Sequence, residues 1–477
     1  MRLFGLESEI ASGLDGGLVC DVLSNMARAS ASLPSDGHPA ASRFYANGAR
    51  AYYDCRHPEL CTPECANPVD VVRYKEAMHQ LLWRAAAGTS VRLSRCNVDY
   101  RTRSTFGEHE SYGYRCGIKH IITALMSFMV SRIVLTGAGG LNALHGGIVF
   151  TVSPRSVYHA HPTAEGSTVG RGIIHLKNEP LDRMMSGRLH LTFGENLCSH
   201  RGTYLKVGTT ALVLGLIEAG CCDVRAITFD NPVDVVRAFS SDPTASVAME
   251  TTRGRAVTAR DVQYCYLRQV ENHLFDDWMP EWAPDVVRLW RETLDGLATP
   301  ERLAGVLDWP LKYALFTQHI ERRGFDWDEI IRLNDAFPED AGPNYCDDPT
   351  GCTYCKAITD RQIRSEERAC SVSGEYPRGR LHEFLRLRNE LCEIDFRYGA
   401  FNDDGIFRSL DAAGLLHHQV DGVTSDTIHD AMSEPPAYGS ALKRGTMIKQ
   451  AVDANRPAFA YWDCIEYGDN DMGIIRV

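Results

Sequence analysis

The sequence has little that would direct it to a nucleic acid or a membrane. Its formal net charge is −12 over 477 residues, so we expect no basic surface for nucleic acid. The most apolar stretch, 121–137, contains Arg132 and is short for a bilayer span, which favours a buried helix. The N-terminus has no basic segment followed by an apolar one, so we expect a cytoplasmic protein without a secretory signal.

Internal repeats are also lacking, and the composition is ordinary. The chain is 44% apolar and 23% charged, as in soluble globular proteins. Its length favours one large domain and a smaller one. Sixteen cysteines without an export signal predict reduced thiols, some of them available to a metal.

The pattern of elements predicts an α+β fold. Strand-like runs with interspersed helices extend to about residue 232, and one such run is 188–193. Helical periodicity dominates from about residue 258. The helices expected are 68–87 (entered at Asn67), 204–219, 259–275, 285–297 and 309–323. We expect a catalytic domain over 1–334, an insertion over 335–391 and a small C-terminal domain over 392–477.

The block 47–65 carries the strongest chemical signal. Read as a strand, it directs Arg50, Tyr52 and Asp54 to one face because side chains alternate. Pro58 is expected to end the ladder, since it has no N–H to donate. A cation, a phenol and a carboxylate together favour a polyphosphate–metal site, although charges on an exposed strand face could give the same pattern.

Further carboxylates strengthen the metal interpretation. Glu59 and Glu64 follow within the block, and Glu7 and Glu9 share a face of the first strand. Carboxylates converging from separate strands are what a hard ion such as Mg²⁺ requires. We expect Glu110 to complete this carboxylate cage.

Three more side chains are candidates for nucleotide contacts. Arg188 and His190 share a strand face, where an Arg fork matches phosphate geometry and a histidine can contact phosphate or base. Trp462 could stack on a purine, although a core Trp is the more common outcome. Lys206 would add a further cation, although a solvated lysine is the more common outcome.

A cysteine-rich segment lies in the expected insertion. Four cysteines there could hold structural zinc, which needs four closed N or S ligands: Cys346, Cys352, Cys355 and Cys370. Free thiols are the alternative.

With these motifs in place, the chain resembles the Pup ligase and depupylase/deamidase family. The resemblance rests on Asn47-Gly-Ala-Arg50 and His57-Pro58-Glu59, with further matching segments along the chain. These segments are 5–9, 62–65, 97–99, 109–112, 188–190, 204–214, 230–232, 307–309 and 443–445.

The resemblance implies a fold and roles for residues. The fold would be a glutamine-synthetase-like antiparallel sheet cradle packed by helices, with a small C-terminal α/β domain. Mg²⁺ would be held by Glu7, Tyr52 and Glu59, and ATP would contact Arg50, Thr62 and Trp462. Asp54 would be the essential catalytic carboxylate.

Two reactions are compatible with such a site. A deamidase or depupylase would release ammonia from the C-terminal Gln of a small disordered Pup-like modifier, or cleave the isopeptide bond to a target lysine. A ligase would form that bond through an acyl phosphate. The residues around Asp54 resemble the deamidase/depupylase branch of the family, whereas Asp230-Asn-Pro232 resembles the ligase branch. The resemblance also implies an indirect link to a bacterial proteasome.

Several positions depart from the family pattern. Lys177 and Leu181 replace Arg and His, His200 replaces Glu, and Ser440 replaces Arg. These changes are compatible with a different Pup-like modifier, with a divergent specialised member or with a weakened enzyme. Two further alternatives stay open besides them. One is a carboxylate–amine ligase acting on a small peptide or metabolite, and the other is a nucleotide-binding homologue without turnover.

Overall fold

A computed structural model describes residues 2–12, 16–35, 42–54, 57–166, 170–176, 187–335, 378–468 and 474–477. Its centre is a nine-stranded sheet, in the order β11-β12-β13-β8-β1-β6-β5-β4-β3. These strands are β1 (Phe4–Glu9), β3 (Ser32–Pro34), β4 (Ser42–Tyr45), β5 (Arg50–Asp54), β6 (His57–Cys61), β8 (Glu108–Tyr114), β11 (His159–Ala164), β12 (Arg171–His175) and β13 (Gly187–Leu191). Its neighbours pair antiparallel, except that β11 and β12 are parallel.

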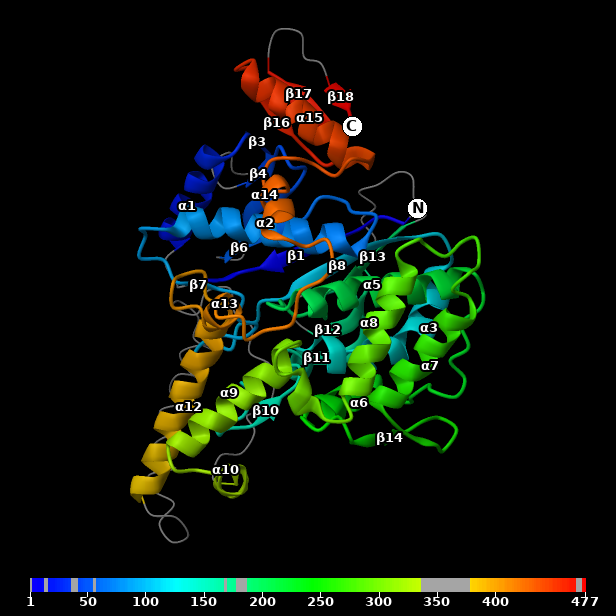
Figure 1. The fold of residues 1–477 in the computed structure, drawn as a ribbon, viewed down its shortest axis with the longest axis vertical. Helices are drawn as coiled ribbons and strands as arrows, with labels where there is room; N and C mark the ends of the chain where they lie inside the picture. Colours follow the sequence, from blue (N-terminus) through cyan, green and yellow to red (C-terminus); the bar gives the residue numbers. More distant parts are fainter. Residues whose placement is uncertain are drawn as a thin grey trace.

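Helices cover one face of this sheet and extend away from it (Figure 1). The helices of the first half are α1 (Gly16–Ala29), α2 (Pro68–Ala86), α3 (Ile118–Ser131), α4 (Ile133–Thr136), α5 (His200–Glu218) and α6 (Pro232–Ser240). Those that follow are α7 (Ala259–Asn272), α8 (Ala283–Gly296), α9 (Asp308–Arg322), α10 (Trp327–Asn334), α12 (Arg378–Tyr398), α13 (Ile406–Ala412), α14 (Ser425–Asp430) and α15 (Gly439–Asp453).

Alternation along the strands separates the two faces. In β1, Phe4, Leu6 and Ser8 are buried, whereas the residues between them are partly exposed. Helix α2 packs on β1 and β6, and α5 packs on β8, so the buried positions face the helices and join the main hydrophobic core. The opposite face, which carries Glu7 and Glu9, is called the site face below.

The last part of the chain forms a separate small layer. Helix α15 and the sheet of β16 (Ala458–Ala460), β17 (Cys464–Tyr467) and β18 (Ile474–Arg476) pack beside β3 and β4, at the top of Figure 1. This layer has its own hydrophobic cluster, whereas Phe401 and Ile428 belong to the main core. The expected boundary at 391/392 falls inside α12, which packs on α9, so residues 392–430 do not separate from the main body.

Most expected helices are present, with shifted ends. Asn67 caps α2 as predicted, because its side chain accepts from the Asp70 N–H. Helix α5 begins at His200, just after the cap Ser199 and four residues earlier than the apolar run indicated. The expected single helix over 121–137 is divided at Arg132 into α3 and α4.

The expectation that Pro58 ends the ladder was wrong. β6 begins at His57 and returns antiparallel to β5, with Pro58 opposite Tyr53. The carbonyl of Pro58 accepts from the Ile10 N–H, so the proline still contributes to the sheet. Block 47–65 is therefore a hairpin rather than one strand followed by an irregular segment.

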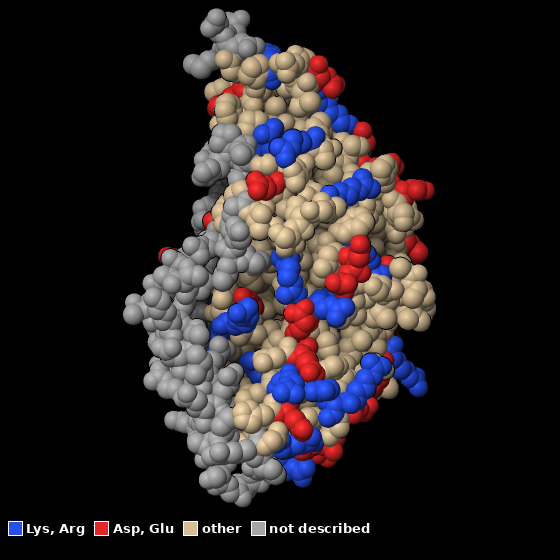
Figure 2. All heavy atoms as spheres, turned by 90° about the vertical axis from the view of Figure 1, so that its left-hand side faces the viewer, with Lys and Arg blue, Asp and Glu red and all other residues tan. Residues whose placement is uncertain are grey.

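The surface and the helices bear on possible partners. On the face shown in Figure 2, basic and acidic side chains are interspersed over the described residues. Such mixing differs from the single-sign stripe that nucleic-acid binding uses. Within the described ranges, no helix is both long and apolar enough to cross a bilayer.

Candidate functional site

Four adjacent strands bring three carboxylates, a phenol and a histidine together on the site face. Glu7 of β1 lies opposite His109 of β8, and Glu9 lies opposite Glu59 of β6. Tyr52 of β5 in turn lies opposite Glu59. Because each partner sits at the same register, the period of two directs all five side chains to one face.

Glu7 joins two neighbours through its two oxygens. Its Oε1 accepts from the Tyr52 hydroxyl, and its Oε2 lies 3.0 Å from His109 Nδ1. Burial alone opposes ionisation, but the hydrogen bond and charge of His109 outweigh it and hold the pKa of Glu7 below its usual range. Glu7 is thus ionised and ready to bind a cation.

His109 lies between two carboxylates. Its Nε2 is 3.4 Å from Glu9 Oε1, and the Gly107 N–H donates to the other oxygen of Glu9. Burial disfavours the imidazolium, but the charges of Glu9 and Glu7 outweigh it and raise the pKa of His109. The rise reflects the negative charge that the two carboxylates place on either side of the ring.

The pKa of Glu59 shows the effect of placing several carboxylates close together. Glu59 is buried, and His57 Nε2 lies 3.4 Å from its Oε1. Burial raises the pKa of Glu59 to about 7, and the charges of Glu7 and Glu9 add to this rise. A divalent cation would relieve this repulsion, so the donor set fits a metal.

His190 reaches the same place from β13. Its Nδ1 is 3.3 Å from the Ser111 hydroxyl, and its ring centroid is 5.4 Å from that of His109. Burial and the neighbouring His109 lower the pKa of His190 to about 3, so the ring is neutral. Arg188, two residues earlier, is on the same face of the strand.

Glu110 is a correction to the expected carboxylate cage. It is fully buried and lies opposite Leu6, on the face of the sheet that the helices cover, called the helical face below. Its carboxylate accepts from both terminal nitrogens of Arg132 and from the Tyr112 hydroxyl, 2.6 Å away. Since alternate residues of β8 face opposite ways, His109 rather than Glu110 meets Glu7.

Lys206 also differs from its expected role as a solvated side chain. Its ammonium is fully buried on the helical face, where it donates to Glu108 and, at 2.8 Å, to the carbonyl of Glu195. Lys75 of α2 contacts the same Glu108 carboxylate at 2.8 Å. These lysines therefore attach α2 and α5 to the sheet and do not reach the site face.

Asp54 ends β5 at the margin of the site face. It is exposed, and it pairs in register with His57. Arg50 and Tyr52 precede it with the same alternation, and the Arg50 guanidinium lies 4.6 Å from the Tyr52 ring centroid. The predicted grouping of these three side chains is therefore present.

Trp462 belongs to the C-terminal layer, where it meets the edge of the sheet. Its ring lies edge-on to Phe44, with centroids 4.9 Å apart, and Phe44 is opposite Arg50 on β4 and β5. Arg444 lies 4.9 Å from the Trp462 ring and donates to its carbonyl at 2.8 Å. The Arg50 guanidinium lies 5.4 Å from the Phe44 ring centroid, so Arg50 and Trp462 both adjoin Phe44.

Arg444 holds the layer in place. It is fully buried, forms an ion pair with Glu64 at 2.5 Å and donates to the Gly48 carbonyl at 2.8 Å. Gly48 has a φ of +83°, which favours glycine in this turn. One guanidinium thus joins α15 to both loops that flank the hairpin.

Thr62 lies beside β1, just after β6. It is buried, and its hydroxyl oxygen accepts from the Leu6 N–H at 3.0 Å. A Cβ on Gly5 would come within 3.1 Å of this oxygen, so glycine leaves room for it. An ATP contact for Thr62 stays a prediction.

Two groups on the site face could hold a cation, with ligand atoms within 4.8 Å of one another: Glu7, His109 and His190, and Glu9, His57 and Glu59. Neither His57 nor His109 is expected as a metal ligand from the sequence. For His57 the spacing His57-Pro-Glu59, which places it on the face of Glu59, was an available signal, whereas only the register of β1 against β8 places His109 opposite Glu7. The four cysteines predicted for zinc, 346, 352, 355 and 370, lie outside the described residues.

A family model described as Pup-ligase protein matches residues 20–336 of the chain. The chain belongs to this family. A Pup deamidase/depupylase of Mycobacterium tuberculosis is 35% identical over 312 residues, which cover 62% of this chain and 61% of that relative. The chain therefore matches about three fifths of the length of such depupylases. A Pup–protein ligase of Rhodococcus erythropolis is 32% identical over 444 residues, covering 89% of this chain and 85% of the relative.

Solved structures share the fold. The Pup ligase PafA in complex with Pup has a TM-score of 0.74 at 21% identity, covering all of this chain and 88% of that one. PafA in complex with ADP has a TM-score of 0.70 at 22% identity, covering 92% and 86%. The predicted α+β cradle of the family is confirmed.

Proposed function

We propose that the protein is an ATP- and Mg²⁺-dependent enzyme of a pupylation-type pathway. It would deamidate the C-terminal Gln of a Pup-like modifier, cleave the isopeptide bond between modifier and target lysine, or both. The observation that carries this proposal is the gathering of Asp54, Arg50 and a carboxylate–histidine cluster on one sheet face of a Pup ligase family member.

The side chains of the site have different proposed roles, which follow from their chemistry. Glu7, Glu9, Tyr52 and Glu59 would hold the metal, which would neutralise charge on phosphate oxygens when bound. Arg50 offers a guanidinium fork for phosphate, and Trp462 a ring for the base. PafA, a relative in fold, is known in complex with ADP.

Asp54 would act at the reacting carbonyl. As a base it would take a proton from water while the water oxygen adds to the amide carbon. It would then give that proton to the nitrogen as the C–N bond breaks and ammonia or the lysine amine leaves. As a nucleophile, its own oxygen would attack that carbon instead and the amine would leave with a proton from solvent. Water would then hydrolyse the resulting anhydride and release Asp54. Its exposed position at the strand end leaves it accessible to a large substrate.

Ligation is the second candidate function. The ligase of Rhodococcus erythropolis matches 89% of this chain, whereas the match to the depupylase of Mycobacterium tuberculosis covers 62%. In that reaction Asp54 would accept a proton from the attacking lysine amine.

A pair of peptide substrates distinguishes the two functions. The purified chain, with ATP and Mg²⁺, would be incubated with a Pup-like peptide ending in Gln, or with one ending in Glu plus a lysine-bearing protein. We expect ammonia release from the first peptide. Isopeptide formation from the second, without ammonia from the first, would identify a ligase. A preformed conjugate of the modifier with a lysine-bearing protein would be incubated in parallel, to detect cleavage of the isopeptide bond. Absence of ammonia, of isopeptide formation and of conjugate cleavage would contradict the pupylation proposal.

Arg444 provides a test of the nucleotide site that does not depend on the reaction. In Arg444→Ala, we expect the affinity for a fluorescent ATP analogue to fall about tenfold or more, which corresponds to about 1.4 kcal/mol. The reason is that Trp462 and the Gly48 turn lose their shared support. Arg456→Ala is the control, since Arg456 stacks on Tyr467 in the same layer. Equal loss in both variants would mean that the layer matters only for stability.

A further inference from the structure

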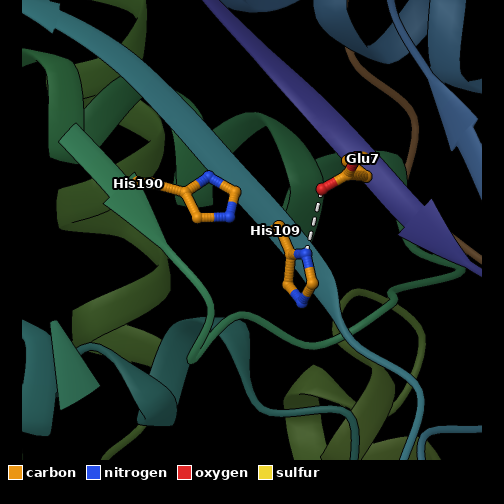
Figure 3. Close-up of side chains that lie close together, drawn as sticks. All are labelled: Glu7, His109 and His190. Carbon is orange, nitrogen blue, oxygen red and sulfur yellow. Dashed lines mark hydrogen bonds and ion pairs between the residues drawn. The ribbon is translucent and has the colours of Figure 1, made fainter. Parts of the chain in front are cut away.

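A group of imidazoles on the site face differs chemically from the other metal donors. Glu7, His109 and His190, called the imidazole cluster here, point toward one another from the adjacent strands β1, β8 and β13 (Figure 3). Their ligand atoms lie within 4.8 Å of one another. The cluster thus offers one carboxylate and two ring nitrogens, on three strands of a rigid sheet.

The hydrogen bonds around His190 prepare it as a ligand. Ser111 lies 3.3 Å from Nδ1, so Nε2 is the nitrogen left to face the cluster. Ligating histidines usually have the other ring nitrogen held in this way, which fixes the tautomer and the ring orientation. His175 lies behind it, 5.7 Å away between ring centroids, and is not part of the cluster.

The neighbouring group is richer in oxygen. This group contains the two carboxylates of Glu9 and Glu59 and a single imidazole, that of His57. The Tyr52 phenol lies in register with Glu59, which in turn lies in register with Glu9. Mg²⁺ prefers oxygen ligands, whereas imidazole suits transition dications. Glu7 lies between the two groups because one oxygen meets Tyr52 and the other meets His109.

We propose that the imidazole cluster holds a first-row transition dication in preference to Mg²⁺, beside the oxygen-rich position that binds Mg²⁺. The Mg²⁺ in the neighbouring position rests on the proposed function. The assignment of a transition ion to the imidazole cluster does not depend on it. The two-imidazole, one-carboxylate donor set carries it, since this combination with open positions is typical of divalent transition ions. The site would then hold two unlike cations that share Glu7.

The test uses Mn²⁺ as the probe, because its electron spin reports its ligands. The full chain, freed of metal by chelation and without nucleotide, would be titrated with Mn²⁺ and followed by electron paramagnetic resonance, with Mg²⁺ as competitor. We expect Mn²⁺ to bind at least about tenfold more tightly than Mg²⁺. Electron spin echo modulation should show coupling to imidazole ¹⁴N. Mn²⁺ binding no tighter than Mg²⁺ binding would overturn the proposal.

Variants identify the ligands. His190→Gln is expected to weaken Mn²⁺ binding at least about tenfold and to reduce the ¹⁴N coupling. Ser111→Ala should weaken it less, through loss of orientation. His175→Gln, which removes the neighbouring imidazole, should change binding less than about threefold. Unchanged ¹⁴N coupling in a folded His190→Gln would contradict the assignment, and thermal melting would establish that each variant is folded.

Nucleotide binding separates this proposal from the broader one. Binding of the fluorescent ATP analogue with Mg²⁺ would be measured on the same samples. If nucleotide binding is intact but the protein binds Mn²⁺ no more tightly than Mg²⁺, the transition-ion proposal alone is wrong. If tight Mn²⁺ binding is present without nucleotide binding, the proposed function is wrong and the imidazole cluster stands.

Discussion

The Asp54→Asn variant is expected to lose about 10²- to 10⁴-fold in turnover while it binds nucleotide normally. Asp54 is exposed at the end of β5, so replacement by an amide of the same size removes a proton acceptor without changing the packing of the core. Arg50 and Tyr52 stay in place because their strand is paired on both sides. The measurement is ammonia release from the Gln-ending peptide, alongside the affinity for the ATP analogue.

The control for Asp54 is an exposed carboxylate far from the site face. Asp285→Asn, at a surface position of α8, should retain the turnover of the unaltered protein. A parallel loss of turnover and nucleotide affinity in Asp54→Asn would assign Asp54 to binding. Unchanged turnover would show that another group carries out the proton transfer.

The Glu108→Gln variant should lower the free energy of unfolding by about 3–5 kcal/mol, because it leaves charged groups buried without their partner. Glu108 is fully buried between Lys75 and Lys206, and Ser8 donates to it at 2.8 Å. The amide cannot offset two ammonium charges. Chemical denaturation followed by tryptophan fluorescence measures the difference.

The pH dependence of stability provides a second signature of Glu108. Burial alone would raise its pKa, but Lys206 and Lys75 outweigh burial and lower the pKa from 4.5 to about 2. The stabilisation is therefore complete above pH 4.5 and is lost as the pH falls toward 2. In Glu108→Gln this slope should be smaller.

The surface ion pair of Asp223 and Arg225 is the matched comparison. Asp223→Asn also removes a carboxylate that is paired with a basic side chain, but this pair is highly exposed. We therefore expect no measurable change in the free energy of unfolding. A destabilisation as large as that of Glu108→Gln would mean that burial is not the cause of the difference.

Local pattern was sufficient for several parts of this protein. The cap at Asn67 and the helical periodicity predicted α2, because a cap and a buried stripe are properties of a short segment. Alternation likewise placed Arg50, Tyr52 and Asp54 on one face, and Glu7 with Glu9 on one face. The motif around Arg50 and His57 also identified the family that the comparisons confirm.

Alternation could not say which face of a strand meets the site. Glu108 and Glu110 share a face of β8, but it is the face that the helices cover rather than the site face expected for Glu110. The register of β1 against β8, which pairs Glu7 with His109, decides this. A shift by one residue would have exchanged His109 for Glu110, and nothing within either strand records the shift.

The sequence by itself determined the family, the main helices and the side chains that share a strand face, because each depends on neighbours within a few residues or on a recognisable motif. Only the tertiary structure decided that His57, His109 and His190 join the carboxylates, that Glu110 and Lys206 are buried ion-pair partners, and that Trp462 reaches the sheet edge. The physical reason is that strand register and the packing of distant segments arise from contacts across the whole fold.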